Sequence, residues 1–113
     1  IVFNMLVSNT DDHLRNHGFI LVPGKGWRLS PAFDMNPVAD SHALKLNVSE
    51  ADNAIDLNLA RAIAPYFRVT SEVANATIER GAATVSQWRK IAVSLGISNR
   101  EQERMASAFR LAA

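Results

Sequence analysis

Apolar and polar positions in the first part of the chain predict short elements joined by loops. Residues 1–8 form a nearly unbroken apolar stretch, a pattern that fits either a helix or a buried strand. Residues 8–16 are dense in polar groups and predict a loop. Residues 19–22 and 27–29 are strand-like, and the turn signal Pro23-Gly24-Lys25-Gly26 between them predicts a β-hairpin.

The middle of the chain changes from strand-like to helical patterns. Residues 43–48 alternate between apolar and polar positions and predict a third short strand. Asp56 is placed to cap a helix that ends near Ala64, because Pro65 disfavours its continuation. A second helix is expected from Ser71, with Gly81 as its weak point or break.

Two further helices with apolar stripes are predicted in the last third of the chain. Gly96 is a good C-cap for the first, and Ser98 with Glu101 is a capping-box signal for the second. The fold class predicted is mainly α (α+β), with a small antiparallel hairpin followed by a helical bundle. The stripe positions are Val85, Trp88, Ala92 and Leu95, then Met105, Ala108, Phe109 and Ala112.

Composition narrows the class of protein. With 113 residues, of which 48% are hydrophobic and 20% charged, a single globular domain is expected, with residues 1–56 carrying the polar loop and hairpin and residues 57–113 the helices. The absence of cysteine excludes disulfides, thiolate zinc sites and cysteine nucleophiles, and favours a reducing compartment. The net charge of +1 gives no broad case for direct nucleic acid binding. No apolar run has the length of a membrane helix, so no membrane partner is expected.

Candidate chemistry is concentrated around Asp11. Asp11 and Asn16 have the spacing of Asp and Asn in the protein-kinase catalytic loop, and Asp34 follows after the predicted hairpin. Phosphoryl transfer needs a carboxylate to orient the attacking hydroxyl and accept its proton. It also needs oxygen ligands for Mg²⁺, which an amide and a second carboxylate supply.

These residues carry a resemblance to a known family. The stretches Asn9-Thr-Asp-Asp-His-Leu-Arg-Asn16, Gly18-Phe-Ile-Leu21 and Trp27-Arg-Leu-Ser-Pro-Ala-Phe-Asp34 resemble the C-terminal part of HipA-like serine/threonine kinases, the toxins of bacterial toxin–antitoxin pairs. Leu44-Lys-Leu-Asn47 and the helical remainder also suit that family. The resemblance implies a kinase-like C-lobe, ATP and Mg²⁺ as cofactors, a protein substrate, a DNA-binding antitoxin as partner, and a cytoplasmic location.

The resemblance also implies roles for individual residues. Asp11 would be the catalytic base, and Asn16 and Asp34 would hold Mg²⁺ against the nucleotide. His13 lies two residues after Asp11, where eukaryotic-type kinases have a phosphate-contacting lysine, so it is expected to face the transferred phosphate. Arg15 departs mildly from the family, which more often has lysine there.

The start of the chain leads to an expectation about its extent. Ile1 is followed directly by apolar residues with no capping residue before them, so we expect the chain to be a piece of a longer protein. The glycine-rich cover and the lysine–glutamate pair of a kinase N-terminal lobe are not in this sequence. The fragment alone is therefore expected to fold, to bind ATP weakly and to transfer no phosphate.

Other interpretations of the same residues remain open. A metal-dependent hydrolase or nuclease would use Asp11, His13, His17 and Asp34 around one ion. A non-catalytic helical module would hold a DNA-binding antitoxin. Asp11 and Asp12 would, in the plainest reading, only cap a turn. His17 alone fits a structural histidine, and Trp27 and Phe33 fit the core or a pocket wall.

Overall fold

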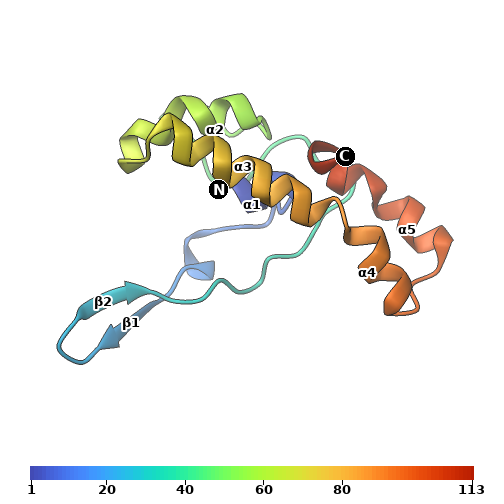
Figure 1. Ribbon diagram of the computed structural model, residues 1–113, viewed down its shortest axis with the longest axis horizontal. Helices are drawn as coiled ribbons and strands as arrows, with labels where there is room; N and C mark the ends of the chain where they lie inside the picture. Colours follow the sequence, from blue (N-terminus) through green and yellow to red (C-terminus); the bar gives the residue numbers. More distant parts are fainter.

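The apolar start of the chain forms a short helix in the middle of the molecule. In the computed structural model, which describes residues 1–113, α1 spans Val2–Leu6 and packs against α2, α3 and the C-terminal turn η3 (Figure 1). Met5 and Leu6 are completely buried. A helix this short is not stable by itself, so its tertiary contacts hold it. Of the two conformations that the apolar run allowed, the chain adopts the helix.

Helices also follow the long irregular segment that ends at residue 56. α2 spans Leu57–Ile63, and the Asp56 carboxylate accepts a hydrogen bond from the Asn58 N–H, as its capping position predicts. Pro65 ends the α-helical pattern, and the chain continues as the 3₁₀ turn η2, Ala64–Phe67. The longest helix, α3, then spans Ser71–Val85.

The C-terminal part folds back on itself. α4 spans Trp88–Ser94 with Leu95 as its C-cap, and Gly96 follows with a φ of 74°, the left-handed conformation expected of a glycine that ends a helix. The capping box between Ser98 and Glu101 is confirmed at the start of α5, Asn99–Met105. The last turns, Ala106–Ala112, are the 3₁₀ element η3 rather than a continuation of the α-helix.

The predicted hairpin is confirmed and projects away from the helices (Figure 1). β1 spans Phe19–Val22 and β2 spans Gly26–Leu29, paired antiparallel with Phe19 opposite Leu29. Because the hairpin does not pack against the helices, both faces of its two-stranded sheet are exposed to solvent. Trp27 is consequently 66% exposed, so the expectation that it belongs to the core or a pocket wall is wrong.

The third strand predicted over residues 43–48 is also wrong. Residues 52–54 lie alongside and accept hydrogen bonds from the Leu44 and Val48 N–H groups, but the pairing is limited to an isolated bridge between Ala43 and Ala54 and forms no regular ladder. The alternation still identifies the inward face, since Leu44 and Val48 are buried. The whole molecule is therefore α+β, with about half of its residues in helices and one two-stranded antiparallel sheet.

Two buried clusters join the first and second halves of the chain. α1 contributes to both; the irregular segment before α2 and α2 itself complete the first, and α3 and η3 complete the second. The first contains Met5, Leu44, Val48, Ile55, Ala60 and Ile63, and the second contains Leu6, Val7, Val85 and Ala112. Because α1 leads directly into the polar loop, these clusters fix the position from which that loop starts. None of the helices combines the length and the apolar composition that a membrane-spanning helix requires.

Gly81 is not a break in the helix, contrary to the prediction. α3 runs through it without interruption. A Cβ atom built on Gly81 would lie 2.8 Å from Leu6 Cδ1 and 3.9 Å from Val2 Cγ1. The glycine therefore permits close approach of α1 and α3, which offsets its poor helix propensity.

Replacing Gly81 by alanine should destabilise the chain, although alanine is the better helix former. The overlap with the completely buried Leu6 outweighs the gain in propensity, so we expect a net loss of roughly 1–2 kcal/mol in the free energy of unfolding. Urea denaturation measures it. In a Leu6→Val background, which lacks the clashing Cδ1 atom, the same change should be neutral or stabilising; an equal loss in both backgrounds would contradict the packing explanation.

Candidate functional site

The polar loop after α1 is held in place by Asn4, a buried residue of that helix. Asn4 Oδ1 accepts a hydrogen bond from Asn9 Nδ2 at 3.0 Å, and Asn4 Nδ2 donates to Asp12 Oδ2 at 2.9 Å. Asn4 and Asn9 are 6% and 1% exposed. Because the Asn4 amide both donates and accepts, its two hydrogen bonds tie the start and the centre of the loop to α1. Asn4 belongs to the apolar start of the chain, where no local sequence signal marks it as a partner of the loop.

Ser8 ties the same loop to the C-terminal end of the chain. It is completely buried with a φ of 51°, and its hydroxyl donates to the Ala108 carbonyl at 2.8 Å. Arg110 Nη1 donates to the Ser8 hydroxyl at 3.0 Å, and the Val38 N–H donates to the Ser8 carbonyl at 3.2 Å. The segment that follows Asp34 and the turn η3 therefore meet at the base of the loop.

Replacing Ser8 by alanine should loosen this junction. The buried Ala108 carbonyl would lose the Ser8 hydroxyl, and the exposed Arg110 guanidinium would lose one of its acceptors, so we expect a loss of about 1–3 kcal/mol in the free energy of unfolding. Alanine is as strained as serine at this φ, so the backbone adds little to the difference. Ser94→Ala, which removes an exposed hydroxyl bonded within α4, is the matched control and should change little. Equal effects of the two changes would contradict the assignment.

Asp12 and His17 form a clamp across the 3₁₀ turn η1, Leu14–Asn16. His17 Nε2 lies 3.1 Å from the Asp12 carboxylate, which also accepts from Asn4. The reading of His17 as a structural histidine agrees with this contact. Because this clamp joins residues on either side of η1, it holds the backbone of the turn that ends at Asn16.

Asp11 takes no part in this clamp and is the accessible carboxylate of the loop. Its side chain is 74% exposed, and its Oδ1 accepts a hydrogen bond from Lys45 Nζ at 3.0 Å. That hydrogen bond, together with the charge of Lys45 and the nearby His13, holds the pKa of Asp11 below its ordinary value of 3.8. Asp11 is therefore ionised at neutral pH, as a general base must be.

Asn16 lies at the wall of a cavity of about 180 Å³ between the loop and the segment after β2. Phe33 and Met35, the neighbours of Asp34, line the same cavity, so Phe33 is in a pocket wall as predicted. Asn16 Nδ2 is buried and has no hydrogen-bond partner. A buried N–H group without a partner is uncommon, and an acceptor such as a phosphate oxygen or a water molecule would satisfy it.

Asp34 lies beside this cavity without lining it. Its backbone has a φ of 56°, in the left-handed region that asparagine and aspartate tolerate best, and its Oδ1 accepts a hydrogen bond from Asn36 Nδ2 at 2.8 Å. The side chain is exposed. The fold thus brings the Asp34 segment next to Asn16, while the carboxylate itself is bonded to its own loop.

His13 is placed differently from Asp11. Its Nδ1 is buried and has no hydrogen-bond partner, as with Asn16. The ring is near enough to Asp11 to favour the ionised carboxylate. The cation in direct contact with Asp11 is nevertheless Lys45, a residue to which the sequence analysis gave no role. The family resemblance of the stretch Leu44-Lys-Leu-Asn47 is the one sequence signal that marks the region of Lys45. Nothing in that stretch indicates that Lys45 contacts Asp11.

The metal-centred alternative loses support from these positions. Asp11 is paired with Lys45, His17 with Asp12, and Asp34 with Asn36. No group of three or more histidine or carboxylate side chains converges on a point that would hold a metal ion. A hydrolase site built from Asp11, His13, His17 and Asp34 around one ion is therefore not formed.

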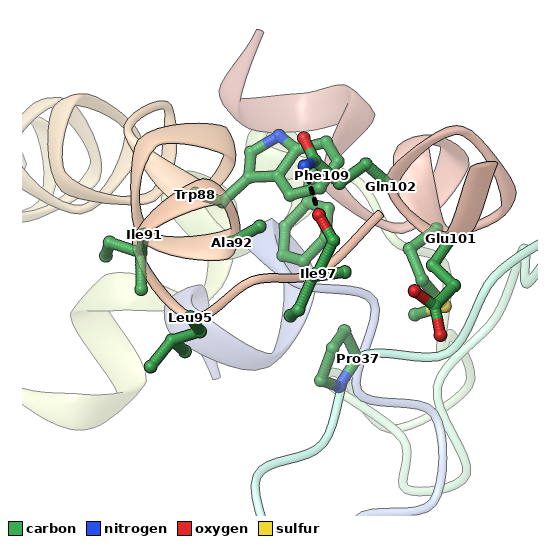
Figure 2. Close-up of a pocket in the computed structure, with 10 residues that line it drawn as sticks. Pro37, Trp88, Ile91, Ala92, Leu95, Ile97, Glu101, Gln102 and Phe109 are labelled. Atoms are coloured by element: carbon green, nitrogen blue, oxygen red, sulfur yellow. Dashed lines mark hydrogen bonds between the residues drawn. The ribbon is translucent and has the colours of Figure 1, made fainter. Parts of the chain in front are cut away.

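A second cavity lies in the helical half, away from this loop (Figure 2). It has a volume of about 290 Å³ and a mostly apolar lining between α4 and α5, with Pro37 at its edge. Trp88 stacks on Phe109, with ring centroids 4.3 Å apart, and Gln102 Nε2 donates to the Ile97 carbonyl at 2.8 Å. Apart from Pro37 it is formed by the C-terminal helices, and none of the candidate site residues lines it.

The fold and site together define an α+β domain with an exposed carboxylate on a pinned loop and a polar cavity after a hairpin. The sequence model of the HipA-like C-terminal domain matches residues 1–110 of this chain. The chain therefore belongs to the HipA-like C-terminal domain family. No curated protein and no solved structure matches it.

Proposed function

We propose that this chain is the catalytic part of a serine/threonine protein kinase of the HipA type, the toxin of a toxin–antitoxin pair. The observation that carries the proposal is the arrangement of the polar loop. It presents an exposed, ionised Asp11 and, five residues later, an unpaired Asn16 amide in a cavity that the Asp34 segment also lines. Family membership supports the same activity.

The reaction we propose is transfer of the γ-phosphoryl group of ATP to a protein hydroxyl. The hydroxyl oxygen forms a bond to the γ-phosphorus, and the bond from that phosphorus to the β–γ bridging oxygen breaks. The electron pair of the broken bond leaves with ADP, and the hydroxyl proton passes to the Asp11 carboxylate. Asp11 is suited to this role because it is accessible and ionised, with Oδ1 alone engaged in a hydrogen bond.

Asn16 and Asp34 are the residues that we propose to hold Mg²⁺. An amide oxygen and a carboxylate are the hard donors that Mg²⁺ prefers. Asn16 would offer its Oδ1, while its unpaired Nδ2 can donate to a phosphate oxygen, and Asp34 fits once its carboxylate exchanges the Asn36 amide for the ion. When bound, the ion neutralises charge on the nucleotide phosphates. His13 is retained as a proposed phosphate contact on the strength of its place beside Asp11.

The proposed partners follow from the same family membership. We propose a protein substrate and a DNA-binding antitoxin, with no direct binding of nucleic acid by this chain, and a cytoplasmic location, where ATP and such an antitoxin are present. The arginine beside Trp88 is consistent with the proposal that this chain does not bind nucleic acid directly. Arg89 lies over the Trp88 ring and pairs with Glu103 at 2.9 Å, so its charge is already matched within the protein.

A phosphotransfer assay on the complete protein tests the proposal. With γ-labelled Mg-ATP and a generic protein substrate, we expect phosphoserine or phosphothreonine to form in step with ADP. ADP formed together with free phosphate and no phosphoprotein would instead indicate an ATPase. Absence of both products at millimolar Mg-ATP would contradict the proposed activity.

A further inference from the structure

The ion pair between Asp11 and Lys45 joins residues 34 positions apart, from two different segments. Lys45 Nζ lies 3.0 Å from Asp11 Oδ1, and the two side chains are 56% and 74% exposed. An ion pair this exposed contributes little to folding, because water and salt screen it. Stability therefore gives little reason for the two residues to meet here.

The backbone around Lys45 is much more firmly held than an exposed lysine requires. Leu44, the preceding residue, is buried in the cluster that contains Met5 of α1. The Leu44 N–H donates to the Asn53 carbonyl at 2.8 Å, and Asn53 Nδ2 donates to the Leu44 carbonyl at 2.7 Å. Both polar groups of the Leu44 backbone are thus paired. α1 and the base of Lys45 belong to one packed unit, from which the lysine reaches the loop that α1 begins.

The two carboxylate oxygens of Asp11 have different surroundings. Oδ1 accepts the hydrogen bond from Lys45, and no protein group donates to Oδ2. We propose that Lys45 is a positioning residue for phosphoryl transfer, holding Asp11 by Oδ1 so that Oδ2 faces the hydroxyl that is phosphorylated. This inference rests on the proposed kinase function. It goes further by naming a residue outside the polar loop on which the base depends.

The chemistry of phosphoryl transfer makes orientation more valuable than basicity. Its transition state is loose, so catalysis comes mostly from positioning and charge, and a carboxylate that is slightly less basic loses little. An exposed aspartate without a fixed partner would sample several rotamers, and misplacement of a reacting group by about 1 Å costs up to roughly 100-fold in rate. Lys45 and His13 are the charged or titratable groups that act on Asp11, and only Lys45 bonds to it.

The first test observes the contact without any need for activity. In the 113-residue chain, a carbon-detected NMR titration of the Asp11 carboxyl should give a midpoint below 3.8. Lys45→Met should move this midpoint upwards towards that value, whereas Lys45→Arg should leave it low. Lys90→Met, an equivalent change on the exposed face of α4, is the control and should not move it. An unchanged midpoint in Lys45→Met would overturn the contact on which the proposal stands.

The second test measures catalysis in the complete protein. Lys45→Met should lower kcat by about 10–100-fold with the KM for Mg-ATP unchanged, and Lys45→Arg should recover most of the loss. A purely structural role would instead change the melting temperature or KM, and arginine would not rescue kcat selectively. If the wild-type protein transfers phosphate and Lys45→Met does so equally well, the Lys45 proposal is wrong and the kinase proposal stands. If the wild-type protein transfers none, the kinase proposal is wrong and this one fails with it.

Discussion

The Asp11→Asn variant of the complete protein should lose phosphoryl transfer by about 100-fold or more while it keeps its fold, because that is the scale on which a general base contributes. Asparagine has the shape of aspartate but cannot accept the hydroxyl proton. The folding cost should be small, since Asp11 is exposed and its only bonded partner, Lys45, is exposed as well. Initial rates of phosphoprotein formation measure the effect, and the affinity for Mg-ATP should be unchanged.

Asp40→Asn is the matched control for this change. Asp40 is also exposed, and its φ of 57° is one that asparagine adopts as readily as aspartate. Its side chain lies beside the C-terminal turns rather than in the polar loop. Near-normal turnover in Asp11→Asn, or an equal loss in both variants, would remove Asp11 from the mechanism.

The second large effect is expected at Asp34. Asp34→Asn should abolish the Mg²⁺-dependent part of nucleotide binding in the complete protein, because the change removes the carboxylate charge that we propose to hold the ion. Asparagine is chosen over alanine because the φ of 56° at this position suits asparagine and strains alanine. Calorimetric titration with ATP, in the presence of Mg²⁺ and then of EDTA, separates the metal-dependent binding from the rest.

His17→Ala distinguishes this assignment from a histidine–metal site. His17 contacts Asp12, which keeps its second partner Asn4 when the ring is removed. We therefore expect Mg²⁺-dependent binding in His17→Ala to remain close to that of the wild-type protein. A larger loss in His17→Ala than in Asp34→Asn would favour the histidine and contradict the proposed Mg²⁺ ligands.

Several elements were predictable from the sequence because their causes are local. The hairpin follows from strand-like residues on both sides of Pro23-Gly24-Lys25-Gly26, in which both glycines adopt a positive φ. The starts of α2 and α5 follow from Asp56 and from the Ser98–Glu101 pair, whose hydrogen bonds close within three residues. Dense polar residues after α1 likewise identify the loop that carries the candidate site.

Other features depend on residues that the sequence separates widely, and only the tertiary structure decided them. A positive φ and a turn are properties of a few neighbouring residues. A close approach of two helices depends instead on all the buried side chains, distant in sequence, that pack between and around them. Gly81 therefore looked like a break and is instead the place where α3 contacts Leu6 of α1. The alternation over residues 43–48 marks an inward face, but it does not determine whether the neighbouring residues 52–54 pair along a full strand, and they form only an isolated bridge.

The candidate site divides in the same way between local and long-range causes. The sequence by itself determined which residue types lie on the polar loop, including Asp11 and Asn16, and their spacing in the chain. The tertiary structure alone decided that Ser8 bonds to Arg110, 102 residues away, and that Lys45 reaches Asp11. The physical reason is that a spacing of a few residues is set by local backbone geometry, whereas contacts between distant residues form only when the buried clusters around α1 bring their segments together.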